Sequence, residues 1–184
     1  MDHFLSEFEI QFRAGFLSDL EQTLAKVQHE KVYACAFGTD SDWVTLFMAV
    51  NTEESLSKHI TNMKEQGLCD SEQDEVYYRW GCSEYQYGEE THFNHISRLL
   101  YATEEVQGYK DEIIRIIAKV VNETADDVFA RYGQAKADIT FFVSLTDDDL
   151  AEEIENQSVH QMTVPSLASK FLKRYDGMNQ NELT

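Results

Sequence analysis

Apolar residues recur at helical spacing along the first part of the chain. Phe4, Phe8, Phe12 and Phe16 stand four residues apart, and leucines continue the same stripe to residue 24, while acidic and glutamine side chains occupy the other positions. This period predicts an amphipathic helix that buries one side. A helix lying on a membrane surface carries a basic polar face, whereas this one is acidic, so the pattern indicates packing against a protein core.

Two nearly continuous apolar runs follow this helix. They are "VYACAFGT" (32–39) and "WVTLFMAVN" (43–51), and a short Asp/Ser segment joins them. Strands covered on both faces have this composition, and the polar turn predicts a hairpin. The next segment, 52–66, opens with Thr followed by Glu and ends before Gly67. These are the start and stop signals of a helix.

The rest of the chain predicts two more strands among several helices. Alternation in "EVYYRWG" (75–81) favours a third strand, and "DITFFVSL" (138–145) predicts a fourth, with helices over 94–107 and 109–133 and another beginning at Pro165. The expected fold is α+β: a mainly antiparallel sheet of about four strands covered by helices. We expect a single domain over residues 1–174 and a flexible polar tail over 175–184.

Acidic residues outnumber basic ones by 34 to 15, which gives a formal net charge of −19. Nucleic acid and anionic membrane are polyanions, so this charge argues against both as partners and favours a basic protein. The three cysteines are odd in number and lack CxxC spacing, and we find no leader sequence and no apolar run of membrane length. These features predict a cytoplasmic protein with reduced thiols.

Three consecutive aspartates, Asp147, Asp148 and Asp149, follow the last predicted strand. Carboxylates at a strand end are suitable ligands for Mg²⁺. Thr146 is also a suitable N-cap, and a helix dipole favours acids in the first turn. Three successive helical residues point about 100° apart, so they do not converge on one ion. The triplet therefore predicts the start of a helix and no metal.

No sequence signature of an enzyme stands out. GxSxG, the P-loop pattern and GxGxxG are all absent. His92 and His95 are three residues apart, and with Cys82 or Glu89 they offer a zinc or Cys–His site, but a second ligand pair is missing. We predict no cofactor and no catalytic residue. A metal-dependent hydrolase that uses Asp147–Asp149 with His92 or His95 is the enzymatic alternative.

Aromatic residues gather in "YYRWGCSEYQYGEE" (77–90), which holds four Tyr, one Trp and one Arg. Interface hot spots have this composition, and the neighbouring acids favour a basic partner. A sheet edge whose aromatics pack against helices is the structural alternative. The predicted partner-binding residues are Tyr77, Arg79, Trp80, Glu84, Tyr85, Tyr87, Glu89, Glu90, Asp147, Asp148 and Asp149.

Three segments together resemble the bacterial domain-of-unknown-function family 4303. They are "VYACAFGTDSDWVTLFMAVNTEESL", "YYRWGCSEYQYGEE" and "DITFFVSLTDDD", and the resemblance spans about residues 5–155. The family pattern expects a second aromatic residue after "RWG". Tyr85 stands there in this chain, which is a mild departure from the pattern in that loop. The resemblance implies no catalytic residue. It implies a small immunity-type protein of a polymorphic toxin system. The acidic charge and the aromatic segment point the same way, to neutralisation of a basic toxin such as a nuclease by direct binding. A structural or regulatory domain is the remaining alternative.

Overall fold

The computed structural model describes residues 3–88, 91–146 and 148–176. Its strands form one sheet in the order β2-β1-β3. The central strand β1 (Val32–Thr39) pairs antiparallel with β2 (Phe47–Thr52) and parallel with β3 (Thr140–Leu145). The α+β class and the hairpin are confirmed. The mainly antiparallel sheet of about four strands is wrong, because the sheet in the described residues has three strands and is mixed.

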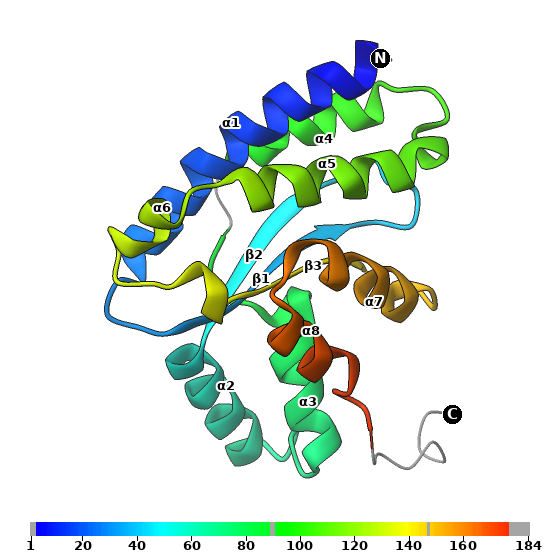
Figure 1. The fold of residues 1–184 in the computed structure, drawn as a ribbon. Helices are drawn as coiled ribbons and strands as arrows, with labels where there is room; N and C mark the ends of the chain where they lie inside the picture. The colour runs from blue at the N-terminus through cyan, green and yellow to red at the C-terminus, as the bar shows by residue number, and fades with distance from the viewer. Residues whose placement is uncertain (1–2, 89–90, 147, 177–184) are drawn as a thin grey trace.

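One face of the sheet is covered by α1 (His3–Lys26), α4 (Phe93–Tyr101) and α5 (Lys110–Glu123), as Figure 1 shows. The phenylalanine stripe of α1 packs on this face. The rings of Phe12 and Phe16 lie 5.4 and 5.5 Å from the ring of Phe37 on β1. The amphipathic helix predicted from this stripe is therefore confirmed, and its apolar side forms much of the main core.

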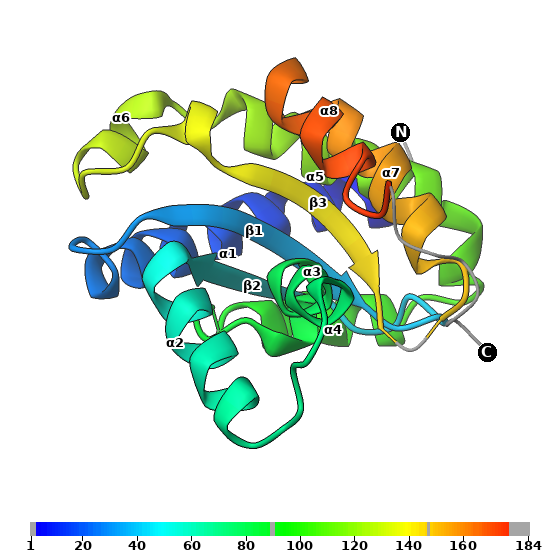
Figure 2. The same cartoon turned by 90° about the horizontal axis from the view of Figure 1, so that it is seen from below.

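The opposite face is covered by α2 (Glu53–Glu65), α3 (Glu72–Trp80) and α8 (Pro165–Leu172), the side turned to the viewer in Figure 2. Small residues of the sheet, Ala34, Ala36 and Ala49, leave room here for large aromatic side chains. The ring of Phe171 lies 4.9 Å from that of Trp80 and 4.7 Å from that of Phe142. Both faces of the sheet are thus buried.

The remaining elements connect these layers. The helix predicted over 109–133 is interrupted, because Thr124 and Ala125 are extended and separate α5 from α6 (Asp126–Ala130). Helix α7 (Ala151–Met162) runs beside β3 (Figure 1), and short 3-10 turns occupy Cys82–Glu84 (η1), Val106–Tyr109 (η2) and Lys136–Asp138 (η3). No helix in the described ranges combines the length and the apolar character needed to cross a bilayer.

The segment predicted as a third strand is helix α3, so that prediction is wrong. Ser71 caps the helix by accepting a hydrogen bond from the Asp74 N–H, and the Asp74 carboxylate accepts one from the Ser71 N–H. This capping box and the acids of the first turn stabilise a helix start. The alternating aromatics that indicated a strand are distributed around α3, where Trp80 faces the core and Tyr77 is 51% exposed.

Asp148 and Asp149 do not lie in the first turn of a helix, and Asp147 is outside the described residues. Helix α7 begins at Ala151, and its N-terminal end has no side-chain cap. Thr146 instead continues the edge of the sheet, where its N–H donates to the Thr39 carbonyl at 2.9 Å. Asp148 forms the turn before the helix, because its carboxylate accepts a hydrogen bond from the Leu150 N–H at 2.8 Å. Thr146 therefore lies directly after β3, hydrogen-bonded to the end of β1, and is not the predicted N-cap.

The outer edge of β3 is covered by two hydroxyl groups. Thr163 Oγ1 accepts a hydrogen bond from the Phe141 N–H at 2.7 Å and donates one to the Phe141 carbonyl at 2.7 Å. Ser158 Oγ accepts from the Val143 N–H at 2.8 Å and lies 3.3 Å from the carbonyl of the same residue. Each hydroxyl thus occupies positions that a further strand would use.

The edge of β2 is covered in a similar way. Val50 and Tyr87 exchange two backbone hydrogen bonds, of 2.7 and 3.1 Å, which form an isolated antiparallel bridge. The Ser97 hydroxyl of α4 accepts from the Leu46 N–H and donates to the Leu46 carbonyl, both at 3.0 Å. The single bridge at Tyr87 thus pairs with β2 at the position where a fourth strand would lie.

Candidate protein-binding groove

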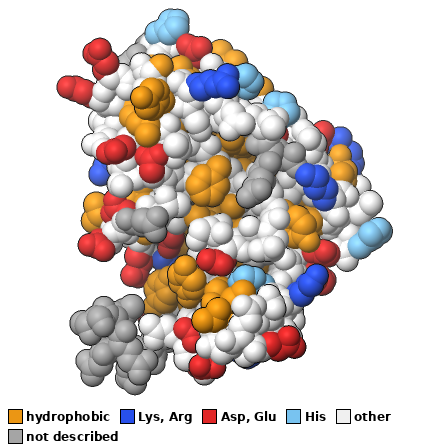
Figure 3. Space-filling model, turned by 180° about the vertical axis from the view of Figure 1, so that it is seen from behind, with side chains coloured by type: hydrophobic (Ala, Val, Ile, Leu, Met, Phe, Trp, Pro, Cys, Tyr) orange, Lys and Arg blue, Asp and Glu red, His pale blue; other side chains and the backbone are white. Residues whose placement is uncertain are grey.

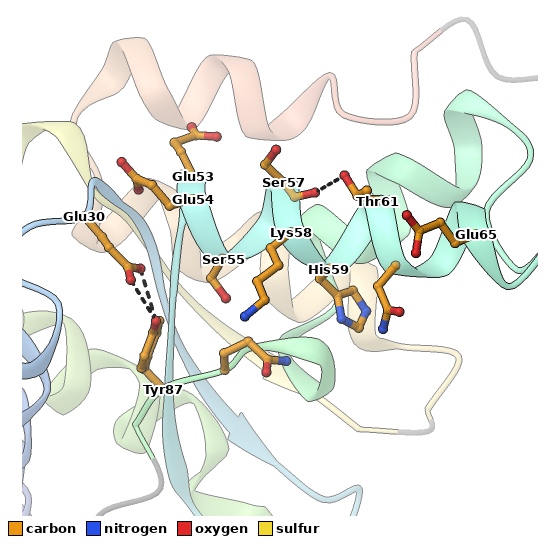
Figure 4. A pocket seen from close by; sticks show the side chains of 12 residues that line it. Glu30, Glu53, Glu54, Ser55, Ser57, Lys58, His59, Thr61, Glu65 and Tyr87 are labelled. Carbon is orange, nitrogen blue, oxygen red and sulfur yellow. Dashed lines mark hydrogen bonds between the residues drawn. The ribbon is translucent and has the colours of Figure 1, made fainter.

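An open groove of about 1220 Å³ runs along α2. Its walls are the solvent side of α2, the segment after η1 that carries Gln86 and Tyr87, and Glu30 just before β1 (Figure 4). Figure 4 shows Glu30, Glu53 and Glu54 at one end and Glu65 at the other, with Lys58 and His59 between them. We call this surface the α2 groove.

The N-terminal end of α2 fixes the acidic end of the groove. Thr52 ends β2 and caps α2, because its hydroxyl oxygen accepts a hydrogen bond from the Ser55 N–H at 3.0 Å. The same hydroxyl donates to Glu30 at 2.5 Å. Glu53 and Glu54 then occupy the first turn, where the helix dipole favours their charge. The antiparallel pairing of Val32 with Thr52 brings Glu30 beside this turn.

Donors hold three of the groove carboxylates in place. The Tyr87 hydroxyl lies 3.1 Å from both Glu30 oxygens, and the Lys31 N–H donates to Glu54 at 2.8 Å. Arg79 binds Glu53 through two nitrogens, at 3.0 and 2.5 Å. Burial and the Glu30 carboxylate raise the pKa of Tyr87, so its phenol remains a donor at neutral pH. These carboxylates are therefore arranged before any partner arrives.

The charges that line the groove are unequal. Four glutamates line it against one lysine, Lys58. Lys58 is exposed and makes no ion pair with any side chain that the structure describes. His59 lies at the floor, with Nε2 3.5 Å from Glu84 and its ring 5.0 Å from that of Tyr78. The groove offers negative charge and hydrogen-bond acceptors to a cationic group.

Comparison with protein families assigns the chain. The family model described as Domain of unknown function (DUF4303) matches residues 16–162. The chain belongs to the DUF4303 family. The match extends from α1 to the end of α7 and so includes the whole sheet and the α2 groove. No curated protein and no solved structure matched the chain.

Several predicted binding residues of this DUF4303 chain lie inside the protein. Tyr85 is only 9% exposed, and its hydroxyl donates to the Arg79 carbonyl at 3.0 Å. Trp80 is half-buried against Tyr33 and Phe171. Burial raises the pKa of both Tyr33 and Tyr85, which keeps these phenols protonated. Trp80 and Tyr85 thus pack within the protein, but Trp80 lies on helix α3 and not on the sheet edge of the structural alternative.

The other predicted residues are distributed over separate parts of the surface. Arg79 lies 4.4 Å over the Tyr33 ring, with its guanidinium on Glu53, and Tyr87 lines the α2 groove. Tyr77 is exposed on α3, and Glu84 lies beside His59. At the end of β3, Asp148 is half-buried and Asp149 exposed. Glu89, Glu90 and Asp147 lie outside the described residues.

The α2 groove itself was not predicted from the sequence. A signal was present, because a hairpin between 32–39 and 43–51 places the residues before the first strand beside those after the second. Glu30 and the Thr52–Glu53–Glu54 segment stand at these two positions. The hairpin brings Glu30 close to Glu53 and Glu54. Glu65 lines the opposite end of the same groove because it lies near the C-terminal end of α2, whose direction the hairpin does not specify.

The described residues bring no further metal ligands to His92 and His95, and Glu89, one of the ligands considered, lies outside them. Among described side chains, no group of three His, Cys, Asp or Glu residues lies close enough together to hold a metal ion. His92 instead lies against α1, with Nδ1 2.5 Å from Asp19. Cys82 is the buried first residue of η1, and burial raises the pKa of its thiol to about 11.

Proposed function

We propose that this DUF4303 chain is a binding module, an immunity-type protein that neutralises a basic toxin domain in the cytoplasm by direct contact. The observation that supports this proposal most is the α2 groove, whose carboxylates are oriented by Thr52, Tyr87 and Arg79. Preorganised charges lose little side-chain entropy when a partner binds. A toxin that binds nucleic acid presents lysines and arginines, and the groove offers carboxylates in place of phosphates.

The overall charge supports the same partner. A net charge of −19 attracts a basic domain over long distance and accelerates encounter. Figure 3 shows acidic side chains at many places around the margin of one face of the molecule, with lysines and arginines among them. This distribution gives a general attraction and no unique docking point. The α2 groove supplies the local complementarity that the general field lacks.

The covered sheet edges favour docking through side chains. Many partners bind by adding a strand to an exposed edge. Here the Thr163 and Ser158 hydroxyls occupy the edge of β3, and Tyr87 and Ser97 occupy positions on the edge of β2. The partner would therefore insert cationic side chains into the α2 groove rather than extend the sheet.

Isothermal titration calorimetry against purified basic toxin domains, beginning with any that is encoded beside this gene, tests the proposal. We expect a stable complex at 50 mM salt whose association constant falls steeply when salt is raised to 500 mM, because charge steering is screened. An inactive toxin variant with its basic residues retained serves as the titrant, so that hydrolysis does not obscure the heat. Absence of binding at low salt would overturn the proposal.

A further inference from the structure

A stripe of small and polar residues interrupts the apolar side of α1. Gly15, Ser18, Asp19 and Gln22 recur at i, i+3, i+4 and i+7, so they share one face of the helix. This face meets the start of α4. A Cβ on Gly15 would lie 3.5 Å from the Cβ of His92 and 3.2 Å from Ile96, so the glycine allows α4 to approach closely. The two helices thereby bring His92 against Ser18 and Asp19.

A chain of hydrogen bonds joins these residues. His92 Nδ1 lies 2.5 Å from Asp19 Oδ1, and His92 Nε2 lies 3.5 Å from Ser18 Oγ. Gln22 Nε2 donates to Ser18 Oγ at 3.2 Å. Because Ser18 accepts from Gln22, its own proton is free to point toward His92 Nε2. In that arrangement the neutral imidazole donates from Nδ1 to Asp19 and accepts from Ser18 at Nε2.

Asp19 is buried, whereas His92 and Ser18 reach the surface, and this arrangement suits nucleophilic catalysis. Asp19 is 0% exposed, whereas the His92 side chain is 45% exposed. A buried carboxylate fixes the tautomer of an imidazole and stabilises its protonated form, and an adjacent base activates a serine hydroxyl. A serine–base contact is often looser before substrate binds, which accommodates 3.5 Å.

We propose that Ser18 is an activated nucleophile with His92 as its general base and Asp19 as the positioning residue, and that it reacts with small carboxylic esters. Ser18 Oγ bonds to the ester carbonyl carbon while its proton passes to His92 Nε2. The proton then passes to the departing alcohol, which leaves an acyl-serine. Water attacks the acyl carbon with the same base and releases the acid. No metal or redox partner is required.

The site is open to solvent, so an ester reaches it from the surface of the protein. Ser18 is half-buried on the side of α1, and His92 immediately precedes the nine-residue helix α4. The N-terminal end of that helix favours negative charge, the kind that develops on the carbonyl oxygen during attack. This proposal is independent of the α2 groove and of toxin binding.

A fluorophosphonate probe tests the proposal, because it forms a covalent Oγ–P bond with activated serines and releases fluoride. Purified chain is incubated with the probe, and peptide mass spectrometry locates the adduct. We expect one predominant adduct at Ser18, its loss in Ser18→Ala and a rate reduced at least tenfold in His92→Gln. Ser83→Ala removes an exposed serine elsewhere and should label like wild type.

The role of Asp19 as a positioning residue is tested by a measurement that the loss of a purely structural residue would not change. In folded Asp19→Asn protein, the pH profile of labelling should move toward lower pH, because the negative charge that favours the imidazolium is gone. Circular dichroism verifies the fold of each variant. No adduct on folded wild-type chain, or equal labelling in Ser18→Ala or His92→Gln, would overturn the proposal.

Discussion

At the scale of single residues, Glu155 and Arg174 form a buried charge pair near the end of the described chain. Glu155 is 7% exposed, accepts a hydrogen bond from Ser144 at 2.6 Å and pairs with Arg174 at 2.8 Å. The Arg174 guanidinium lies 4.0 Å over the Phe171 ring and also donates to Asn156. Removing one member of a buried pair leaves an uncompensated charge. This network therefore fastens α8 to α7.

Glu155 gives a pH dependence with a definite sign. Burial raises the pKa of its carboxyl above the ordinary value near 4.5, although Ser144 and Arg174 oppose this shift. The folded state thus holds the proton more tightly than the unfolded state does. The contribution of Glu155 to stability is largest below pH 4.5 and declines as pH rises through the raised pKa.

Urea unfolding of wild type and Glu155→Gln at pH 4, 5, 6 and 7 measures this effect. We expect the free energy of unfolding of wild type, relative to the variant, to decrease from pH 4 toward pH 7. The glutamine preserves the shape and the acceptor oxygen while it abolishes titration. A relative stability of wild type that rises over this interval would contradict the assigned direction.

At the scale of elements, β3 depends on α7 and the residue after it for its outer hydrogen bonds. Thr163 satisfies both backbone groups of Phe141, and Ser158 satisfies the N–H of Val143. An unpaired buried backbone group costs about 1–3 kcal/mol. The parallel strand at the edge is thus stabilised by side chains in place of another strand.

Thr163→Val tests this role, since valine keeps the shape and removes the hydroxyl. We expect a loss of about 1–3 kcal/mol in the free energy of unfolding and faster hydrogen exchange at the Phe141 amide. Thr163→Ser retains the hydroxyl and should keep the Phe141 amide protected. Unchanged exchange in the valine variant would mean that the hydroxyl does not protect this edge.

Elements with one dominant pattern were predictable from the sequence. The phenylalanine stripe predicted α1, and the two apolar runs predicted the hairpin. The Thr–Glu start predicted α2. Helix α3 was not recognised, because Val76, Tyr78 and Trp80 also alternate as in a strand, although Ser71 and Asp74 carried the capping signal. The parallel pairing of β3 depends on tertiary packing, which local sequence does not specify.

The candidate sites were harder to predict for the same reason. The aromatic segment 77–90 was recognisable, but Trp80 and Tyr85 pack into the second core, which composition does not distinguish from exposure. Ser18 and Asp19 lie 73 or more residues from His92, and only the packing of α1 on α4 brings them together. Gly15 was the one local sign of that close approach.

At the scale of the whole molecule, negative charge occurs over much of the surface, and local structure determines where carboxylates are arranged to bind a partner. The chain carries −19 overall, and acids appear at many places around the margin of the face shown in Figure 3. In the α2 groove four glutamates line a concave surface, and described donors hold three of them. The central claim is that this groove, and not charge in general, binds the basic partner.

A charge-matched comparison by isothermal titration calorimetry tests this claim most directly. One variant carries Glu54→Lys and Glu65→Lys, two exposed positions of the groove, and the control carries Glu104→Lys and Glu153→Lys, two exposed positions outside its lining. Both change the net charge by the same amount. We expect the groove variant to bind the toxin domain at least about tenfold more weakly than the control does. Equal affinities of the two variants would contradict the claim.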